Sequence, residues 1–548
     1  MNPLLRGLRL PTILLLAASW QLGGCTRKAE DESSVCGPLV EEWGGGSLPA
    51  YTPLTVAEIQ TILGQGVEQA SALGAAAVVA VVDREGFVLG VFAMTGAPLG
   101  PVFPVPASLP PDGAPGINAA IAKARTAAAL SSNQNAFTSR TAAFIVDQHF
   151  PPGVQFTPGG PLFGVQNSND TAGDVVRGVG AGGAPISSNP TPLPDPNGFS
   201  GAAGGLPLYK GGWLVGAVGV SGGADEKCAV TATRGFMAPH PIRACEIFVD
   251  GIRLDFARVE PPFVYAALAF AALPGSVVDP VTQGAGTIVA GGPPAALPIA
   301  TLGGVTGQVV FPIISSPLVA TPKLVSADVT SILSNAAALM VQLRAAIRAP
   351  YGTRAQTTIA VVDTAGNILG VFRPADCTRF SLDLAVQKAR TVVAYSNGIA
   401  SPELGEPIDG LPVGSAVTTR AIGWMAQPLY PPGIDGTYPG PLSGIQDALP
   451  GGLGAGIAGL DITPGSTVDA TNGNGITIFP GGIPLYKGGV LVGGIGVSGD
   501  GVDQDDYTAS AGAAGFGAPT ALRCDNYFVR GALLPWTRYP RNPFEGVQ

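Results

Sequence analysis

Short apolar runs separated by turn residues recur along the chain and predict β-hairpins with helices between them. The block 78–92 holds two apolar runs around an Asp-x-x-Gly turn, and the block 206–220 holds two runs around a Lys-Gly-Gly turn. Both patterns are typical of antiparallel hairpins. Helices are predicted around them: Thr55 opens the first with a capping box, an alanine-rich helix spans 118–130, and a third begins near Asp225.

The same order of motifs occurs twice, with a period of about 280 residues. The matching blocks are 79–92 with 359–372, 123–126 with 388–391, 150–153 with 430–433, 160–166 with 440–446, and 205–223 with 482–500. The second copy is therefore expected to repeat the helices over 381–395 and from about Asp505. Chance does not produce five collinear matches, and the period is far too long for a solenoid. The sequence predicts a tandem duplication of one domain.

The predicted elements of each copy follow the order helix, hairpin, helix, hairpin, helix. This order favours an α+β fold, in which helices pack on an antiparallel sheet. Pro/Gly-rich insertions enlarge both copies, and an apolar connector between them is expected to pack along the domains. We expect these divisions: 1–24 signal peptide, 25–49 tether, 50–255 domain 1, 256–321 connector, 322–535 domain 2 and 536–548 C-terminal tail.

A glycine pattern in the second copy, GIGVSG at 494–499, satisfies the GxGxxG form of a dinucleotide-binding loop. That loop lies between the first strand and the first helix of a parallel βαβ unit. Here the glycines come late in the domain, on the second strand of a hairpin, and the first copy has Ala217 where Gly494 stands. We therefore interpret them as sites of close packing on a central strand.

The N-terminus has the form of a secretory signal, with a basic start, a short apolar run over 10–18 and small residues before Cys25. Leu-Gly-Gly-Cys at 22–25 resembles the lipobox of bacterial lipoproteins, which implies lipidation of Cys25. Thr26 follows in place of Asp, so the resemblance implies an outer membrane lipoprotein, periplasmic or on the cell surface. A plain secretory signal is the alternative.

The cysteines are compatible with an oxidising compartment but leave their pairing open. Five remain after Cys25: Cys36, Cys228, Cys245, Cys377 and Cys524. The pair closest in sequence, Cys228 with Cys245, is the first candidate for a disulfide. No C-x-x-C-H occurs, which excludes covalent c-type haem.

Composition narrows the classes of function. The 548 residues carry a formal net charge of −9, so no nucleic-acid partner is expected. No H-E-x-x-H, paired C-x-x-C or Walker sequence occurs, and an enzyme is the least expected class. Asp503, Asp505 and Asp506 lack EF-hand spacing and suit a helix N-terminus, so no metal ligands are assigned.

Four motifs occur in both copies: Val-Val-Asp-x-x-Gly, Lys-Ala-Arg-Thr, Gly-x-Pro-Leu and Val-Gly-x-x-Gly-Val-Ser-Gly. Together they resemble the GlcG/HbpS family of haem-binding-like domains. The resemblance covers most of the chain in two copies and implies a profilin-like α/β sandwich, dimers or higher oligomers, and haem as the candidate cofactor. The family's Lys-Ala-Arg-Thr helix maps onto Lys123, Arg125, Thr126, Lys388, Arg390 and Thr391.

On one helix face, the lysine of this motif could meet a propionate and the threonine could approach the ligand. The structural alternative is that the threonine bonds back to its helix while the charged residues are solvated. Only two histidines occur, His149 and His240, and the matching positions hold Leu429 and approximately Thr520. A haem site common to both copies therefore lacks the commonest axial ligand, and His149 is a candidate in one copy only.

Two classes of function follow. The first is an extracytoplasmic, membrane-anchored binding protein of the GlcG/HbpS type that holds haem or a similar planar cofactor. The second is a ligand-free structural or interaction lipoprotein that uses the family's dimerising fold for assembly, with itself or with other cell-surface proteins. Low charge, abundant glycine and the fused pair favour the second class, whereas the resemblance favours the first.

Overall fold

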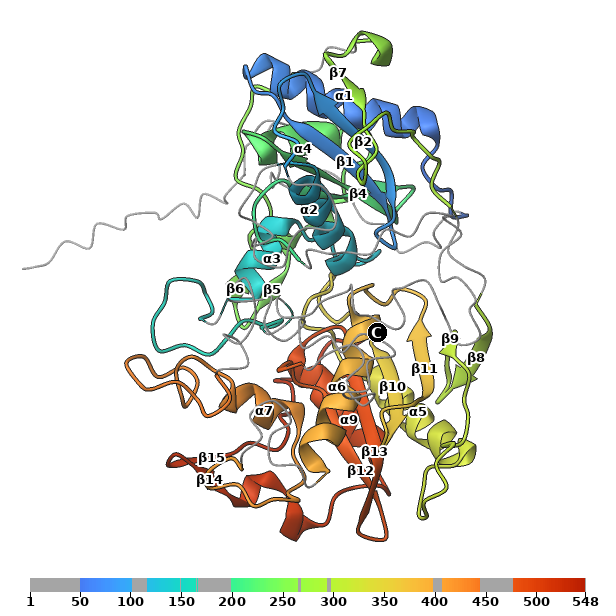
Figure 1. The fold of residues 1–548 in the computed structure, drawn as a ribbon, viewed down its shortest axis with the longest axis vertical. Helices are drawn as coiled ribbons and strands as arrows, with labels where there is room; N and C mark the ends of the chain where they lie inside the picture. Colours follow the sequence, from blue (N-terminus) through green and yellow to red (C-terminus); the bar gives the residue numbers. More distant parts are fainter. Residues whose placement is uncertain are drawn as a thin grey trace, which may run out of the picture.

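The structure is a computed structural model of the chain and consists of two α+β units, the first above the second in Figure 1. It describes residues 50–100, 116–147, 149–163, 165, 199–264, 268–292, 297–397, 407–443 and 477–547. The predicted signal peptide, tether and Cys25 lie outside these ranges, as does Cys36. In the described part, no helix combines the length and the apolar character that a membrane crossing requires.

Domain 1 is built on an antiparallel sheet between two helical layers. The sheet has the order β3 (Gly205–Lys210), β4 (Trp213–Ser221), β1 (Val78–Asp83), β2 (Val88–Met94) and β7 (Gly275–Val277). Alternate residues of β1 face opposite layers, as the period of a strand requires. Val79 and Val81 pack with α1 (Val56–Ala72) and α4 (Asp225–Ala232), and Val78 and Ala80 pack with α2 (Ile117–Leu130).

Domain 2 repeats this arrangement. Its sheet has the order β12 (Gly482–Lys487), β13 (Val490–Ser498), β10 (Thr358–Asp363), β11 (Ile368–Pro374), β9 (Val305–Phe311) and β8 (Ile299–Leu302). One face carries α5 (Ser326–Met340) and α9 (Val502–Gly512), and the other carries α6 (Ser381–Ser396). The predicted α+β fold and the predicted order of elements are confirmed.

The segment that we expected as a connector supplies three further strands, of which β7 and β8 form sheet edges. β7 pairs with β2 of domain 1, and the hairpin β8–β9 pairs with β11 of domain 2. Gly303 and Gly304 form the β8–β9 turn, both with positive φ, which suits a two-residue hairpin turn. The sequence did not predict these strands because β7 and β8 are short and all three lie among Gly and Pro residues.

Each domain also contains short elements that the sequence reading omitted. The short helices α3 (Ser139–Ile145) and α7 (Thr419–Met425) are capped by Thr138 and Thr418. Each domain also has a short hairpin whose strands are two residues long. β5 (Phe248–Val249) pairs with β6 (Ile252–Arg253) in domain 1, and β14 (Phe528–Val529) pairs with β15 (Ala532–Leu533) in domain 2. Single 3-10 turns occur at His240–Ile242, Ala244–Glu246, Phe270–Ala272, Thr520–Leu522 and Cys524–Asn526.

The repeated glycines lie where a helix crosses the central strand closely. A Cβ on Gly219 of β4 would lie 2.0 Å from the carbonyl oxygen of Ala120, and one on Gly496 of β13 would lie 1.9 Å from that of Ala385. Any side chain there would force the helix away from the sheet. The interpretation of these glycines as close packing is confirmed, and the strand is antiparallel to its neighbours.

The predicted disulfide Cys228–Cys245 is wrong, because Cys228 is a free, buried thiol. It lies on α4 within the apolar core of domain 1, and burial raises the pKa of its thiol to about 12. Cys228 therefore acts as a small apolar residue. Cys377 and Cys524 of domain 2 are also free and buried.

The β1–β2 turn gives a prediction on pH. Asp83 Oδ1 accepts hydrogen bonds from the backbone N–H groups of Glu85 and Phe87, and burial raises its pKa to about 7. Because the pKa of Asp83 is higher in the folded protein than in the unfolded chain, protonation of this carboxyl stabilises the fold at low pH. This stability is lost as the pH rises toward 7. We expect Asp83→Asn to remove this loss, so its urea midpoint should rise relative to wild type at pH 8 but not at pH 5.

Asp363, the counterpart in domain 2, provides the control. Ser316 Oγ and Asn367 Nδ2 donate to its second carboxylate oxygen. Asp363→Asn should therefore lower the urea midpoint at both pH values, because the amide cannot accept these bonds on both oxygens. A rise of the Asp83→Asn midpoint that is the same at pH 5 and pH 8 would contradict the assignment.

Candidate functional site

The lysines of the repeated Lys-Ala-Arg-Thr helices join three elements inside each domain. Lys388 Nζ lies 2.8 Å from Asp505 Oδ2 and 2.6 Å from the carbonyl oxygen of Val497, and it lies 4.1 Å from the centre of the Phe479 ring. Both side chains of the Lys388–Asp505 ion pair are fully buried. This lysine ties α6 to β13 and α9.

The equivalent contacts recur in domain 1. Lys123 Nζ lies 2.7 Å from Asp225 Oδ2 and 3.2 Å from the carbonyl oxygen of Val220. Here the Asp225 side chain is 22% exposed, so water reaches the pair. The same bonds therefore connect α2 to β4 and α4, but here the ion pair is partly exposed to water.

The arginines and threonines of the motif are also bonded to the protein. Arg125 Nε and Arg390 Nε each donate to a hairpin-turn carbonyl, of Gly86 and Gly366, at 2.8 Å. Thr126 donates to the carbonyl of Ala122, and Thr391 to that of Gln387. The threonines bond back to their helices as in the structural alternative, but the charged residues are buried instead of solvated. Contact of these six residues with a ligand stays a prediction.

The structure places His149 in a contact between the two domains. Its Nε2 lies 3.0 Å from Asp435 Oδ1, and its Nδ1 lies 3.0 Å from the carbonyl oxygen of Thr157. Phe156 donates its backbone N–H to the other oxygen of Asp435 at 3.0 Å. The ring thus joins the loop of domain 1 to the equivalent loop of domain 2, and a role as a haem ligand stays a prediction.

A buried arginine holds the domains together. Arg348 lies in the segment between α5 and β10, which is longer than its counterpart in domain 1. Its Nε lies 2.5 Å from Asp500 Oδ2, and one terminal nitrogen lies 2.8 Å from both Asp376 Oδ2 and Ser132 Oγ. Burial acts in the opposite direction, but Asp500 and Asp376 raise the pKa of Arg348. This cation neutralises two carboxylates of domain 2 while it donates to domain 1.

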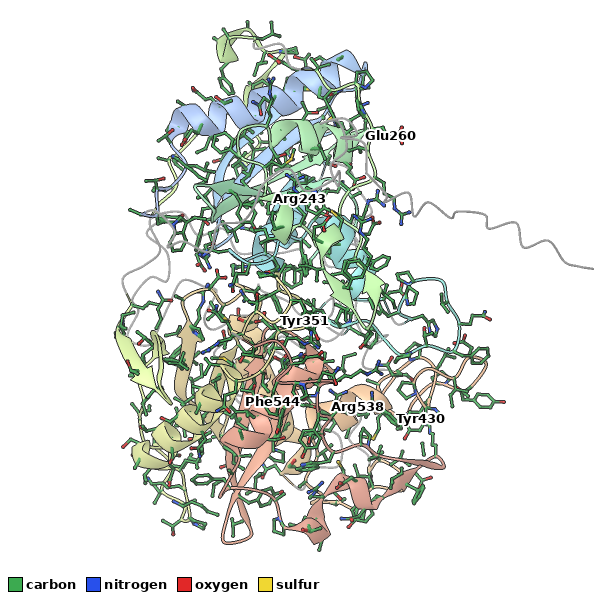
Figure 2. All side chains as sticks on the ribbon, turned by 180° about the vertical axis from the view of Figure 1, so that it is seen from behind. Arg243, Glu260, Tyr351, Tyr430, Arg538 and Phe544 are labelled. Atoms are coloured by element: carbon green, nitrogen blue, oxygen red, sulfur yellow. The ribbon has the colours of Figure 1, made fainter. Side chains whose placement is uncertain are left out.

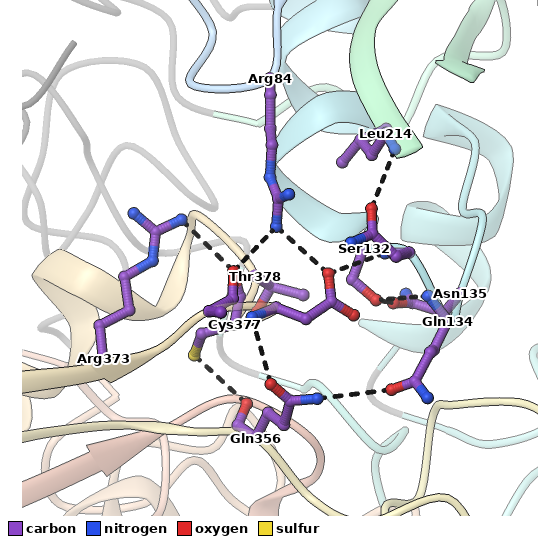
Figure 3. A network of polar contacts seen from close by, with 12 residues as sticks. Arg84, Ser132, Gln134, Asn135, Leu214, Gln356, Arg373, Cys377 and Thr378 are labelled. Carbon is purple, nitrogen blue, oxygen red and sulfur yellow. Dashed lines mark hydrogen bonds and ion pairs between the residues drawn. The ribbon is translucent and has the colours of Figure 1, made fainter. Parts of the chain in front are cut away.

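Further polar contacts surround this arginine. Figure 3 shows Arg84 reaching from domain 1 toward the segment of Cys377 and Thr378 in domain 2. A terminal nitrogen of Arg84 lies 3.2 Å from Asp376 Oδ1, and Arg373 lies 3.3 Å from Glu85 Oε1. Burial would raise the pKa of Glu85, but Arg373 and Arg84 lower it overall. The charges alternate across the boundary and fix the two domains in one arrangement.

A cleft of about 850 Å³ lies beside this contact and is lined by both domains. Domain 1 contributes the loop around Pro158 and the β5–β6 turn at Asp250, and domain 2 contributes α7 and the start of α9. The C-terminal tail adds residues 538–542. Figure 2 shows Tyr351 near the boundary of the domains and Arg538 in domain 2 beneath it.

The cleft combines aromatic rings with arginines. The Arg344 guanidinium lies over the Tyr351 ring at 4.7 Å, and the Arg538 guanidinium lies over the Trp424 ring at 5.8 Å. Arg420 also lines the cleft, but it is paired with Asp503 at 2.5 Å and with Asp506. The arrangement offers flat apolar surfaces with positive charge at their edges.

The sequence reading missed this site. Arg344, Trp424 and Arg538 lie far apart in the chain, and only the tertiary fold brings them into one wall. A partial signal exists in the repeat, because Trp424 and Arg538 correspond to Phe144 and Arg258 of domain 1. Among the described residues, no group of three or more His, Cys, Asp or Glu side chains is placed to hold a metal ion.

Comparisons with known proteins agree with the predicted resemblance for domain 2. Residues 333–514 match the family model described as "Haem degrading protein HbpS-like", and this part of the chain is an HbpS-like domain. No curated protein matches the chain. The presence of a second such domain in the first half stays a prediction.

Three solved structures are similar to part of this chain. A PduOC–haem complex is 21% identical over 36% of this chain and 98% of that chain, with a TM-score of 0.23. The Klebsiella pneumoniae protein ORFY is 22% identical over 35% and 96%, with a TM-score of 0.22. A double mutant of Streptomyces reticuli HbpS is 24% identical over 36% and 96%, with a TM-score of 0.18.

Proposed function

We propose that this chain is an extracytoplasmic, membrane-anchored binding protein of the HbpS type that holds haem, or a similar planar cofactor, between its two domains. The observation that carries the proposal is the cleft of about 850 Å³ lined by both domains, with Trp424 and Tyr351 in its walls. Its volume lies within the range of about 300–1,000 Å³ that is typical of small-molecule sites.

The proposal includes a second HbpS-like domain in the first half of the chain. Support comes from the shared sheet order and from the repeated bonds of Lys123 and Lys388 to equivalent carboxylates and strand carbonyls. Two copies in one chain build a cleft that a single domain lacks. The anchor is the proposed lipid on Cys25, which would hold the chain at the outer membrane.

The residues of the cleft fit a haem group. Trp424 offers a ring face for stacking, and Tyr539 offers a phenol, a class of side chain that ligates haem iron in some proteins. The Tyr351 hydroxyl donates to Glu545 Oε2 at 3.1 Å, so this residue contributes its ring. Haem, when bound, supplies an iron centre. The chain itself supplies the aromatic walls, the charges that hold the acid groups, and the shielding of the macrocycle from water.

Titration of the protein from Thr26 onward with haemin tests the proposal. We expect a Soret shift that saturates at about one equivalent. Trp424→Leu should weaken binding about twofold to tenfold, because an aromatic contact contributes roughly 0.5–1.5 kcal/mol beyond its buried area. Its counterpart Phe144→Leu lies outside the cleft lining and should bind as wild type, with folding of both variants checked by circular dichroism. No saturable shift at micromolar haemin would overturn the proposal.

A second candidate function is assembly without a ligand. The observation that favours it is the β14–β15 hairpin, where the side chains of Phe528 and Leu533 are 62% and 47% exposed. Exposed apolar residues of this size suit a contact with a second copy or another cell-surface protein. Absence of haemin binding together with a concentration-dependent sedimentation coefficient would favour this function over the first.

A further inference from the structure

Arg538 brings to the cleft a guanidinium that forms no ion pair with a side chain of the described residues, although Asp503 and Asp506 lie near it. Within the described ranges, no acidic side chain lies within ion-pair distance of its guanidinium. Its backbone N–H donates to Asp506 Oδ2 at 3.0 Å, which holds the residue in place while the guanidinium faces Trp424. Its counterpart in domain 1, Arg258, instead lies 2.9 Å from Asp255. The repeat therefore shows the same arginine once with a partner and once without.

Arg344 supplies a second guanidinium with donors to spare. Its terminal nitrogens donate to the carbonyls of Ala345 and Arg541 at 3.2 and 3.1 Å, and both acceptors are neutral. The Nε atom is buried and has no hydrogen-bond partner among the described residues. A buried donor without a partner is costly, so this nitrogen indicates a missing acceptor.

The other charged side chains described in the cleft do not form ion pairs with Arg538 or Arg344, so the cleft keeps an excess of positive charge. Asp503 and Asp506 are used by Arg420, and Asp250 lies 3.9 Å from a nitrogen of Arg541. Partial desolvation and the repulsion of Arg420 lower the pKa of Arg538, and the opposite effect of Asp503 and Asp506 is smaller. A locally positive cleft in a chain of net charge −9 is a specific feature and not a general property of the surface.

We infer that the cleft recognises an aromatic ligand by its carboxylate groups, which bind Arg538 and Arg344 while the ring system packs on Trp424 and Tyr351. The inference rests on the proposed function for the position of the ligand. Guanidinium groups bind carboxylates through two parallel hydrogen bonds, and their flat faces stack on rings. Both guanidiniums already lie over rings, so their edges are the parts that can donate to the acid groups.

The test compares haemin with its dimethyl ester, in which the acid groups are blocked. We expect the full chain to bind haemin about tenfold to hundredfold more tightly than the ester, because hydrogen bonds to charged groups contribute roughly 1.5–3 kcal/mol. Arg538→Gln should weaken haemin binding about tenfold and leave ester binding unchanged. The matched control is Arg258→Gln, which removes the counterpart outside the cleft and should change neither affinity. Arg344→Gln gives a second, independent variant.

The outcomes separate this inference from the proposed function. Equal binding of haemin and ester by wild type, with no effect of either cleft variant, overturns carboxylate recognition and leaves haem binding intact. If neither porphyrin binds, 1-pyrenecarboxylate and neutral 1-pyrenemethanol are used as probes, followed by fluorescence. Preference for the acid that is lost in Arg538→Gln supports the inference although the haem proposal fails. Binding of neither pyrene, or of both equally, overturns it.

Discussion

Replacing Arg348 by methionine is expected to lower the free energy of unfolding by about 3–5 kcal/mol, the range found when one member of a buried ion pair is removed. The Arg348 and Asp500 side chains are fully buried, and Asp376 is 12% exposed. The variant would leave Asp500 buried without its cation and Asp376 with Arg84 alone. It would also remove the hydrogen bond to Ser132 of domain 1.

Urea denaturation followed by circular dichroism measures this effect. The exposed Arg258→Met is the control and should cost less than about 1 kcal/mol, as is usual for surface ion pairs. Addition of Asp500→Asn to Arg348→Met should recover part of the loss, because one uncompensated charge is removed. A loss below 1 kcal/mol for Arg348→Met would show that this residue does not hold the domains together.

Lys388→Met is expected to have a similar effect, of about 3–5 kcal/mol, because Asp505 is fully enclosed and would lose its cation. The same change in domain 1, Lys123→Met, is expected to cost only about 1–2 kcal/mol. There the partner Asp225 is 22% exposed, so water can solvate the carboxylate that is left behind.

The comparison of the two lysines also tests the role of the repeated motif. Both variants are measured by urea denaturation at pH 7, with haemin affinity as a second readout. A structural role predicts unequal losses of stability and unchanged affinity once the variants are folded. Equal losses of stability, or a selective loss of haemin binding in either variant, would contradict a purely structural role. Such a result would indicate that these helices contact the ligand.

Much of the fold could be predicted from local chemistry. Thr55 and Glu58 form the expected capping box, the hairpin turns lie where Asp83 and the Lys-Gly-Gly sequences placed them, and Gly496 marks the close crossing of α6. These features depend on neighbouring residues or on a strict steric limit. β7 and β9 depend on pairing with the distant strands β2 and β11, and their local signals are weak, so the sequence alone assigned this segment to a connector.

The candidate site was less accessible to prediction. The resemblance indicated the helix that contains Lys388 and Thr391, whose side chains bond to Asp505 and to the carbonyl of Gln387 within domain 2. The cleft instead depends on how two domains meet, and on a tail residue, Arg538, that lies outside the family match at 333–514. Nothing in a single copy of the repeat indicates that Arg538 lacks the partner that Arg258 has.

The most direct test of the central claim is a crystal structure of the haemin complex with an iron anomalous difference map. The account predicts one iron peak in the cleft between the domains, beside Trp424 and Tyr351, with the propionates toward Arg538 and Arg344. A peak beside Thr126 of α2 or Thr391 of α6 would contradict it and would place the ligand within a single domain.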